Sequence, residues 1–267
     1  MGAMRATDDG AAPWTRYGAA LDALRRAEAG ASVDGDLTGH SERVAFTTRA
    51  IARAAGYDRP VVEMMTVAAR FHDVGKLRID PALMRKPGRF DDDERREMER
   101  HASHGHIILS RIDGIDDMFL DAAKYHHERY DGMGYEGLAG EDIPLVARVV
   151  AIADVHDALV AKRVYKEAMP ESEVLVMMTR DAPGPGMGRG AFDPALLRTF
   201  VAVRLDDPRF KAAEAELAAG VRASGKDYQD PVPALRAFAA SPLPSPSAPE
   251  AGLEDGNGPA VDGPGPR

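Results

Sequence analysis

The chain has 267 residues, 44% of them apolar, a net charge of −9 at pH 7 and no cysteine. This composition excludes disulfides and thiolate metal ligands, and it argues against general affinity for nucleic acid, which requires a basic surface. Because there is no apolar run of about 18 residues and no apolar signal-peptide core near Met1, we expect a cytoplasmic protein without a membrane span.

The N-terminal part predicts two helices. Residues 1–12 are small and charged, and we expect them to be disordered. Helical spacing of apolar side chains predicts a first helix over 13–29, and a Gly- and Asp-rich break separates it from a second over 39–55. His40 lies on the apolar face of the second helix. A lone histidine there is usually a hydrogen-bonded core residue, so His40 alone does not indicate a metal.

The central motif of the chain is Phe71-His72-Asp73-Val74-Gly75-Lys76, which follows an apolar run. That run predicts a buried helix with His72 and Asp73 in its last turn and Gly75 at its end. Because a helix C-terminus carries partial negative charge, a buried Asp73 requires a positive neighbour. That neighbour is Arg70, Lys76 or a metal ion for which neutral His72 is a second ligand.

More histidines and a second isolated carboxylate follow downstream. A charged helix predicted over 91–112 carries His101 next to an apolar position, whereas we expect His104 and His106 on a solvated face. A helix over 116–129 ends in adjacent histidines and a Gly-rich loop. The helix over 144–159 is apolar around nearly its whole circumference, yet Asp154 lies in its middle without a cation one turn away.

The rest of the chain completes an all-α prediction. Further helices are expected near 171–180, 193–205 and 207–222, and no segment has a convincing strand pattern. The Pro-, Ser- and Gly-rich end is predicted to be disordered. We therefore divide the chain into an N-terminal extension with one helix (1–38), a core domain (39–205), a helical extension (206–240) and a tail (241–267).

Seven nitrogen and oxygen donors lie on or beside predicted buried faces of five helices. Seven groups exceed what one ion takes from protein, but they suit two ions that share a bridging carboxylate. Imidazole and carboxylate ligands favour iron, manganese or zinc. Two such ions best support attack of a bridging hydroxide on phosphorus. The candidate ligands are His40, His72, Asp73, His101, His126, His127 and Asp154.

The order of these motifs resembles the HD-GYP subgroup of HD-domain phosphohydrolases, over roughly 39–200. The matching elements are His40, His72-Asp73-x-x-Lys76, His101-x-x-x-Gly105, His126-His127-Glu128, Asp131-Gly132-x-Gly134-Tyr135, Asp154-Val155-x-Asp157-Ala158-Leu159 and Arg163-Val164-Tyr165-Lys166. The resemblance implies an HD-domain helical bundle with a metal centre in its core. It also implies hydrolysis of cyclic di-GMP, to pGpG and/or GMP, through a metal-bridging hydroxide.

The resemblance also assigns roles by position. The seven donors become the ligands of two divalent ions, iron or manganese, and Asp73 bridges them. Lys76 contacts the scissile phosphate, Arg163 and Lys166 bind the nucleotide, and Gly134 and Tyr135 belong to a loop at the mouth of the site. Asp36 stands where some members carry a glutamate that supports a third metal.

Two positions depart from the family pattern. Glu136 replaces the proline of the GYP motif and adds a negative charge that could weaken cyclic di-GMP binding. His156 replaces an aromatic residue, and we expect it to pack rather than to bind metal.

The alternatives are another HD phosphohydrolase activity, on a different cyclic dinucleotide, a nucleotide or (p)ppGpp, and a non-catalytic cyclic di-GMP sensor. Residues 1–38 are too short for a receiver or sensor domain, so regulation would come through substrate, metal supply or a partner, for example a GGDEF-type protein. A homo-oligomer remains open.

Overall fold

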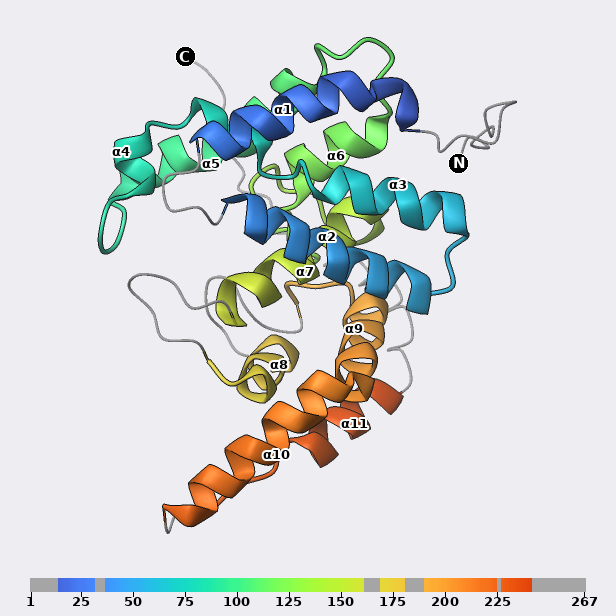
Figure 1. The fold of residues 1–267 in the computed structure, drawn as a ribbon, viewed down its shortest axis with the longest axis vertical. Helices are drawn as coiled ribbons and strands as arrows, with labels where there is room; N and C mark the ends of the chain where they lie inside the picture. The colour runs from blue at the N-terminus through green and yellow to red at the C-terminus, as the bar shows by residue number, and fades with distance from the viewer. Residues whose placement is uncertain (1–13, 32–36, 161–168, 181–189, 225–226, 242–267) are drawn as a thin grey trace, which may run out of the picture.

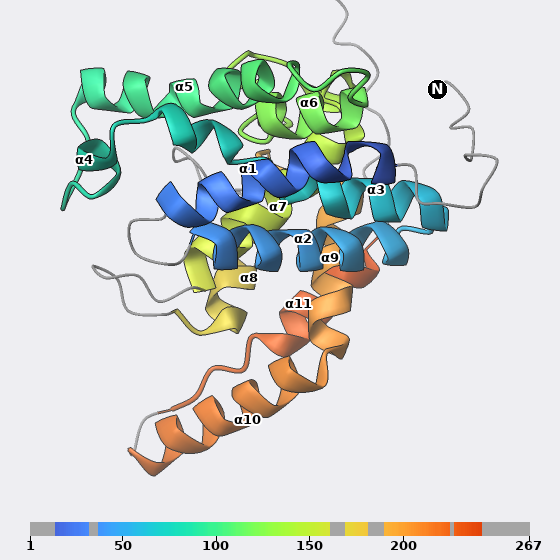
Figure 2. The same cartoon turned by 45° about the horizontal axis from the view of Figure 1, so that its top comes forward.

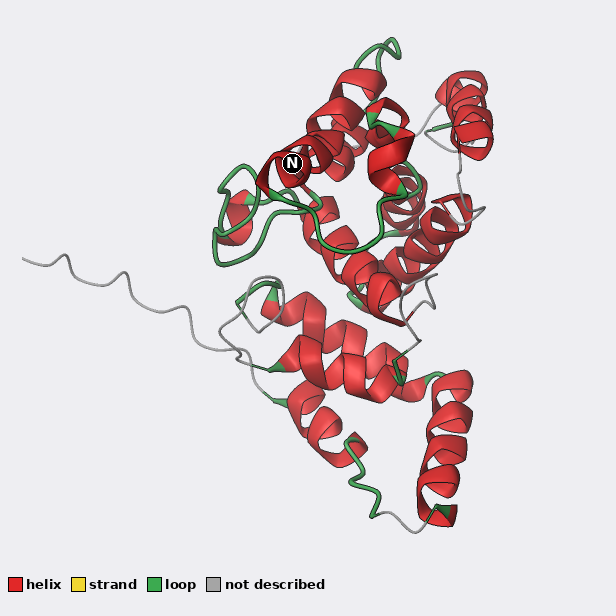
Figure 3. Ribbon diagram, turned by 90° about the vertical axis from the view of Figure 1, so that its left-hand side faces the viewer, coloured by secondary structure: helices red, strands yellow, loops and turns green. Residues whose placement is uncertain are grey.

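The computed structural model describes residues 14–31, 37–160, 169–180, 190–224 and 227–241. Within these ranges all regular secondary structure is helical (Figure 3), so the predicted all-α class is confirmed. Asp36, Arg163, Lys166 and the predicted tail beyond Ser241 lie outside the described residues. No helix in the described ranges is both long and apolar enough to cross a lipid bilayer.

The helices form a bundle with an extension at one end (Figures 1 and 2). The first part of the chain contains α1 (Gly18–Ala31), α2 (Leu37–Ala54), α3 (Arg59–Ala69), α4 (Pro81–Met84), α5 (Asp92–Leu109) and α6 (Asp117–Tyr125), with the 3-10 segments η1 (Thr15–Tyr17) and η2 (Val74–Arg78). The second part contains η3 (Gly140–Asp142), α7 (Leu145–Val160), α8 (Glu171–Thr179), α9 (Pro194–Asp206), α10 (Pro208–Ala223) and α11 (Val232–Ala240).

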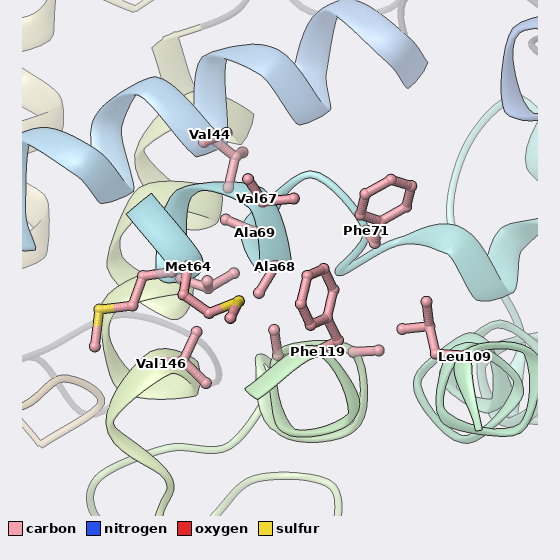
Figure 4. Close-up of a cluster of buried hydrophobic side chains, with 14 of the residues drawn as sticks. Val44, Met64, Val67, Ala68, Ala69, Phe71, Leu109, Phe119 and Val146 are labelled. Carbon is pink, nitrogen blue, oxygen red and sulfur yellow. The ribbon is translucent and has the colours of Figure 1, made fainter. Parts of the chain in front are cut away.

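The helix α7 separates two hydrophobic clusters, which explains its apolar circumference. Val146 and Val150 belong to a cluster formed with α1, α2, α3 and α6. Figure 4 shows part of this cluster, with Phe71 and Phe119 among its large side chains. Val149 and Ile152 face the second cluster, formed with α8, α9 and α11. Because both clusters bury α7, this helix can hold a polar residue rigidly inside the protein.

Two of the predicted helices are shorter than expected, and this changes where the site residues lie. The helix α3 ends at Ala69, so His72 and Asp73 occupy the turn between α3 and η2 instead of the last helical turn. The helix α6 ends at Tyr125, and His126 is its C-cap residue. The prediction that these residues are helical was wrong: the backbone switches to bonds between residues three apart, from His72 N–H to Ala69 O and from Glu128 N–H to Tyr125 O.

Gly75 also has a different role from the predicted one. It does not end a helix but lies buried within η2, where a Cβ atom would stand only 1.8 Å from the carbonyl oxygen of His101. The absent side chain therefore allows η2 to approach α5 closely enough to bring Asp73 and His101 together.

Of the two helices beyond the core domain, α11 packs back onto it. Leu235 of α11 is buried in the second cluster, and α11 contacts both α8 and α9. The helix α10 extends away from the bundle at the bottom of Figure 1. The division at 205/206 stays a prediction.

Candidate metal centre

The seven predicted ligands meet in one place, supplied by three helices and two turns. His40 lies on α2, His101 on α5 and Asp154 on α7, while the turns after α3 and α6 supply the others. Their possible ligand atoms form three overlapping sets, and within each set all atoms lie within 4.8 Å of one another. The sets are His101, His126 and His127; His40, His72 and Asp73; and His72, His126 and Asp154.

Asp73 lies between the histidines from the different elements. Its Oδ1 is 3.4 Å from Nε2 of His101 and 3.8 Å from Nε2 of His126. Its Oδ2 is 3.4 Å from Nε2 of His72 and 3.6 Å from Nε2 of His40. A carboxylate with one oxygen toward each group of histidines has the position that a bridging ligand requires.

Backbone carbonyls fix the tautomers of three histidines. Nδ1 of His72 donates to Ala69 O at 2.8 Å, Nδ1 of His101 donates to Met98 O at 2.6 Å, and Nδ1 of His126 lies 3.0 Å from Ala122 O and Ala123 O. A carbonyl oxygen can only accept, so in each neutral ring the proton is on Nδ1 and Nε2 carries a lone pair. This is the arrangement in which protein histidines bind metals.

The Nε2 atoms of these three histidines carry lone pairs and are placed to bind a cation. Nε2 of His101 lies 3.2 Å from Nε2 of His126, and neither atom carries a proton to share. Nε2 of His72 is buried and has no hydrogen-bond partner among the described residues. Buried polar atoms are rarely left unpaired. The lone pairs aimed at one another and the unpaired Nε2 both fit a metal ion bound among these side chains.

His40 is oriented by a carboxylate that the sequence analysis did not single out. Nδ1 of His40 donates to Asp157 Oδ2 at 2.8 Å, and Arg43 donates to both oxygens of Asp157, from Nε at 2.6 Å and from a terminal nitrogen at 3.0 Å. A carboxylate behind a histidine is the usual support of a metal ligand. The sequence contains a signal for this contact: Asp157 is one turn after Asp154 and Arg43 is one turn after His40, so each lies on the same helix face as a predicted ligand.

Burial keeps four of the five histidines neutral. Desolvation lowers the pKa of His72 and His101, lowers the pKa of His126 further, and lowers the pKa of His127 to about 4. Near neutral pH these four rings are therefore uncharged, as metal coordination requires.

His40 and the two aspartates carry charge instead. Burial disfavours the imidazolium form of His40, but hydrogen bonds to Asp154, Asp157 and Asp73 outweigh burial and raise its pKa to about 11. A metal ion bound by His40 would therefore replace the proton on Nε2, which lies 3.1 Å from Asp154 Oδ1. Burial likewise opposes ionisation of Asp73, but Lys76 and the neighbouring histidines hold its pKa well below the usual range. The pKa of Asp154 is also lowered, by His40 and His72 against burial. Both carboxylates are thus ionised.

Lys76 is the positive neighbour that the sequence predicted for Asp73. Its Nζ donates to Asp73 Oδ2, and its side chain is 27% exposed, so it reaches from the buried carboxylate to the protein surface. The other candidate, Arg70, instead donates to Glu42 Oε2 at 3.0 Å.

The loop after His127 is held by the buried carboxylate of Glu128. Its two oxygens accept the backbone N–H of Glu136 at 2.6 Å and that of Leu138 at 2.7 Å. A Cβ on Gly134 would stand 2.5 Å from Cα of Glu128, so a glycine is needed for this approach. The ring of Tyr135 lies 4.6 Å from that of His127 and is partly exposed, which puts the tyrosine at the edge of the site.

Glu136 is paired away from the metal ligands. Its Oε2 lies 3.5 Å from Nζ of Lys124 on α6. Its N–H bond to Glu128 is one that a proline could not make. The replaced proline is therefore compensated by a hydrogen bond in this loop.

The other histidines lie outside the three ligand sets. Nε2 of His156 is 2.9 Å from Glu171 Oε1, and its ring packs edge-on against Phe200, in agreement with the expected packing role. His104 and His106 are half-buried on α5.

Comparison with known proteins agrees with this geometry. Residues 29–194 match the family model described as HD domain. The chain belongs to the HD-domain family. The resemblance expected from the sequence motifs is therefore confirmed.

Three relatives are informative. The cyclic di-GMP phosphodiesterase response regulator RpfG of Xanthomonas campestris is 42% identical over 140 residues, which are 51% of this chain and 36% of the relative. The cyclic di-GMP phosphodiesterase PA4108 of Pseudomonas aeruginosa is 34% identical over 163 residues, 61% of this chain and 38% of the relative. The 3'3'-cGAMP-specific phosphodiesterase 3 of Vibrio cholerae is 39% identical over 141 residues, 52% of this chain and 30% of the relative.

The matched region spans only about a third of the length of these relatives. Among solved structures, Bd1817, a HDG"Y"P protein from Bdellovibrio bacteriovorus, is 18% identical with a TM-score of 0.51, covering 69% of this chain and 62% of that chain. This likeness concerns the fold alone.

Proposed function

We propose that the chain is a metal-dependent phosphodiesterase that hydrolyses cyclic di-GMP to pGpG and/or GMP. The observation that supports this most strongly is the meeting of five histidines and two ionised aspartates in one largely buried cluster, in which the Nε2 lone pairs of His72, His101 and His126 are directed inward. Relatives at 34% and 42% identity are named cyclic di-GMP phosphodiesterases.

The ligands would be His40, His72, Asp73, His101, His126, His127 and Asp154. Asp73 is suited to bridging two ions because each of its oxygens faces different histidines. Two divalent ions, with iron or manganese favoured, would activate a water and neutralise the charge of the phosphate. Asp36 remains the candidate for supporting a third ion.

The chain's own residues would bind and orient the dinucleotide. Lys76 is close enough to Asp73 to donate to a phosphate oxygen beside the ions, where charge grows in the transition state. Tyr135, stacked on His127, offers a partly exposed ring at the edge of the site, and Gly134 allows its loop to lie against Glu128. Arg163 and Lys166 supply the further cations that an anionic substrate needs in an acidic protein.

A second candidate substrate is the mixed dinucleotide 3'3'-cGAMP. It is favoured by the relative at 39% identity that is named for this substrate. A non-catalytic cyclic di-GMP module is a third candidate, but a sensor would not need a complete set of ligands. We place the activity in the cytoplasm and leave a GGDEF-type partner and a homo-oligomer as proposals.

The test combines metal analysis of anaerobically purified protein with product detection. We expect at least two iron or manganese ions per chain, and pGpG or GMP from cyclic di-GMP. Preferential cleavage of 3'3'-cGAMP in the same panel would support the second candidate. Bound metal without turnover of any cyclic dinucleotide would contradict the enzymatic proposal and favour a binding role.

A further inference from the structure

The buried face of the N-terminal helix ends in a carboxylate. Tyr17, Leu21, Leu24 and Glu28 follow one another at spacings of four, three and four residues, so they share one face. Tyr17 and Leu21 are buried in the first hydrophobic cluster, and Leu24 packs against it. Glu28 takes the next position of this face and is only 4% exposed, where an apolar residue would be expected.

In the described part of the chain, no hydrogen bond or ion pair explains the burial of Glu28. Its Oε1 is inaccessible to solvent and has no hydrogen-bond partner among the described residues. Arg25, one turn earlier, lies 2.5 Å from Glu42 Oε1, and Lys76 bonds to Asp73. Burial, and then the negative charge of Asp73, raise the pKa of Glu28 to about 8. A buried carboxyl group without a partner is costly, and its persistence requires a reason.

The surroundings of α1 suggest that reason. The helix packs against η2, which begins directly after Asp73, and against α2, which carries His40. Figure 2 shows α1 alongside α2. The buried face of α1 that ends in Glu28 therefore packs near the two elements that adjoin Asp73 and carry His40. Glu28 itself lies just before the residues matched by the HD-domain family, 29–194.

We propose that Glu28 supplies an additional oxygen ligand to the metal centre from α1, on the side of Asp73. The inference rests on the proposed function, because it requires metal bound by the seven other ligands. A divalent cation on this side would offset two carboxylates and give Oε1 its missing partner, and hard oxygen ligands suit manganese or iron(II). The N-terminal helix would then be part of the site instead of a cover over the bundle.

The test compares Glu28→Gln with the full-length wild-type chain in anaerobic Mn²⁺ titrations with a competing chelator. The variant should bind at least one Mn²⁺ about tenfold more weakly, or lose one equivalent per chain. Asp22→Asn is the matched control, because it makes the same carboxyl-to-amide change at an exposed position of α1 and should leave binding unchanged.

Thermal unfolding supplies a readout independent of activity. Without metal, Glu28→Gln should melt no lower than the wild type, because a buried carboxyl group has been removed. Its gain in Tm on addition of Mn²⁺ should be smaller. Glu28→Leu, which continues the apolar face of α1, repeats the test with a side chain suited to burial.

The outcomes separate the two proposals. If wild-type protein binds metal and hydrolyses cyclic di-GMP while both Glu28 variants bind the same number of ions equally tightly, Glu28 is not a ligand and the proposed function stands. If the wild-type chain binds no metal at all, the proposed function and this inference both fail.

Discussion

Asp154 and His156 lie two residues apart on α7, yet they belong to polar networks of opposite character. His156 bonds to Glu171, and both oxygens of Glu171 also accept from Arg204, at 2.5 and 3.0 Å. Arg204 is further paired with Asp207 at 2.8 Å. Each charge in this network has a protein partner, so the network is complete without any ligand.

The network around Asp154 uses the same residue types and remains incomplete. Four neutral imidazoles face two ionised carboxylates, and Nε2 of His72 has no partner in the described part of the chain. The difference teaches that burial of histidine and aspartate does not by itself indicate function. A structural ion network differs from a cation-binding site in the number of buried nitrogen and oxygen atoms whose lone pairs have no hydrogen-bond partner.

The largest effect should come from Asp73→Asn, which removes the carboxylate between the histidine groups. We expect a loss of cyclic di-GMP hydrolysis on the order of 1000-fold or more, because the charge facing both groups disappears. Helical circular dichroism should be preserved. The matched control is Asp142→Asn, an exposed position in η3. Activity within tenfold of wild type would rule out the two-metal mechanism.

A smaller effect should follow from Asp157→Asn, which weakens the support of His40 without touching a predicted ligand. Mutation of a carboxylate that hydrogen-bonds to a metal-binding histidine typically lowers metal affinity or activity roughly 10- to 100-fold. We expect the lower end, because an asparagine oxygen can still accept from His40 Nδ1 while the charge facing Arg43 is lost. Chelator competition measures the change, and an unaltered metal affinity would show that Asp157 serves only to pack α7 against α2.

Asp157 also illustrates what the sequence could and could not predict. The all-α class, the central position of α7 and the identity of the seven donors followed from apolar periodicity and from charges that lacked partners. The role of Asp157 and Arg43 did not, because it depends on how α2 crosses α7, and residues 43 and 157 are far apart in the chain.

The ends of α3 and α6 were mispredicted for a related reason. Local patterns favour continued helix through His72 and through His126, but after each helix the backbone forms bonds between residues three apart, which the side-chain pattern does not reveal. The sequence predicts Gly75 as a helix terminator, whereas in the structure it allows the contact between η2 and α5. The burial of Glu28 does not follow from the sequence, because it depends on how α1 packs against η2 and α2.

Mutations in the complete network around Glu171 should change the free energy of unfolding and leave metal affinity unchanged. Glu171→Gln should lower the free energy of unfolding by about 2 kcal/mol at pH 7, since hydrogen bonds to charged partners are lost. The bonds to His156 and Arg204 outweigh burial and lower the pKa of Glu171 to about 2, below its value of 4.5 when unfolded. Its stabilisation is therefore present above pH 4.5 and is lost as the pH falls through 2.

Urea unfolding followed by circular dichroism at pH 7 and at pH 3 measures this effect. The difference between wild type and variant should shrink at the lower pH. Glu173→Gln, an exposed charge on the same helix α8, is the control and should be neutral at both pH values. A change in metal affinity in Glu171→Gln would contradict the separation of the two networks.

The smallest effect concerns Glu136, at the edge of the incomplete network. Glu136→Gln keeps the backbone N–H that bonds to Glu128 and removes a charge already paired with Lys124, so KM for cyclic di-GMP should fall only about twofold, as for a surface charge. Glu136→Pro removes the same charge and also the N–H, leaving one oxygen of the buried Glu128 without its donor. Steady-state kinetics should therefore rank the glutamine variant as the tighter binder. If the proline variant binds more tightly than the glutamine variant, rigidity of this loop matters more to substrate binding than its bond to Glu128.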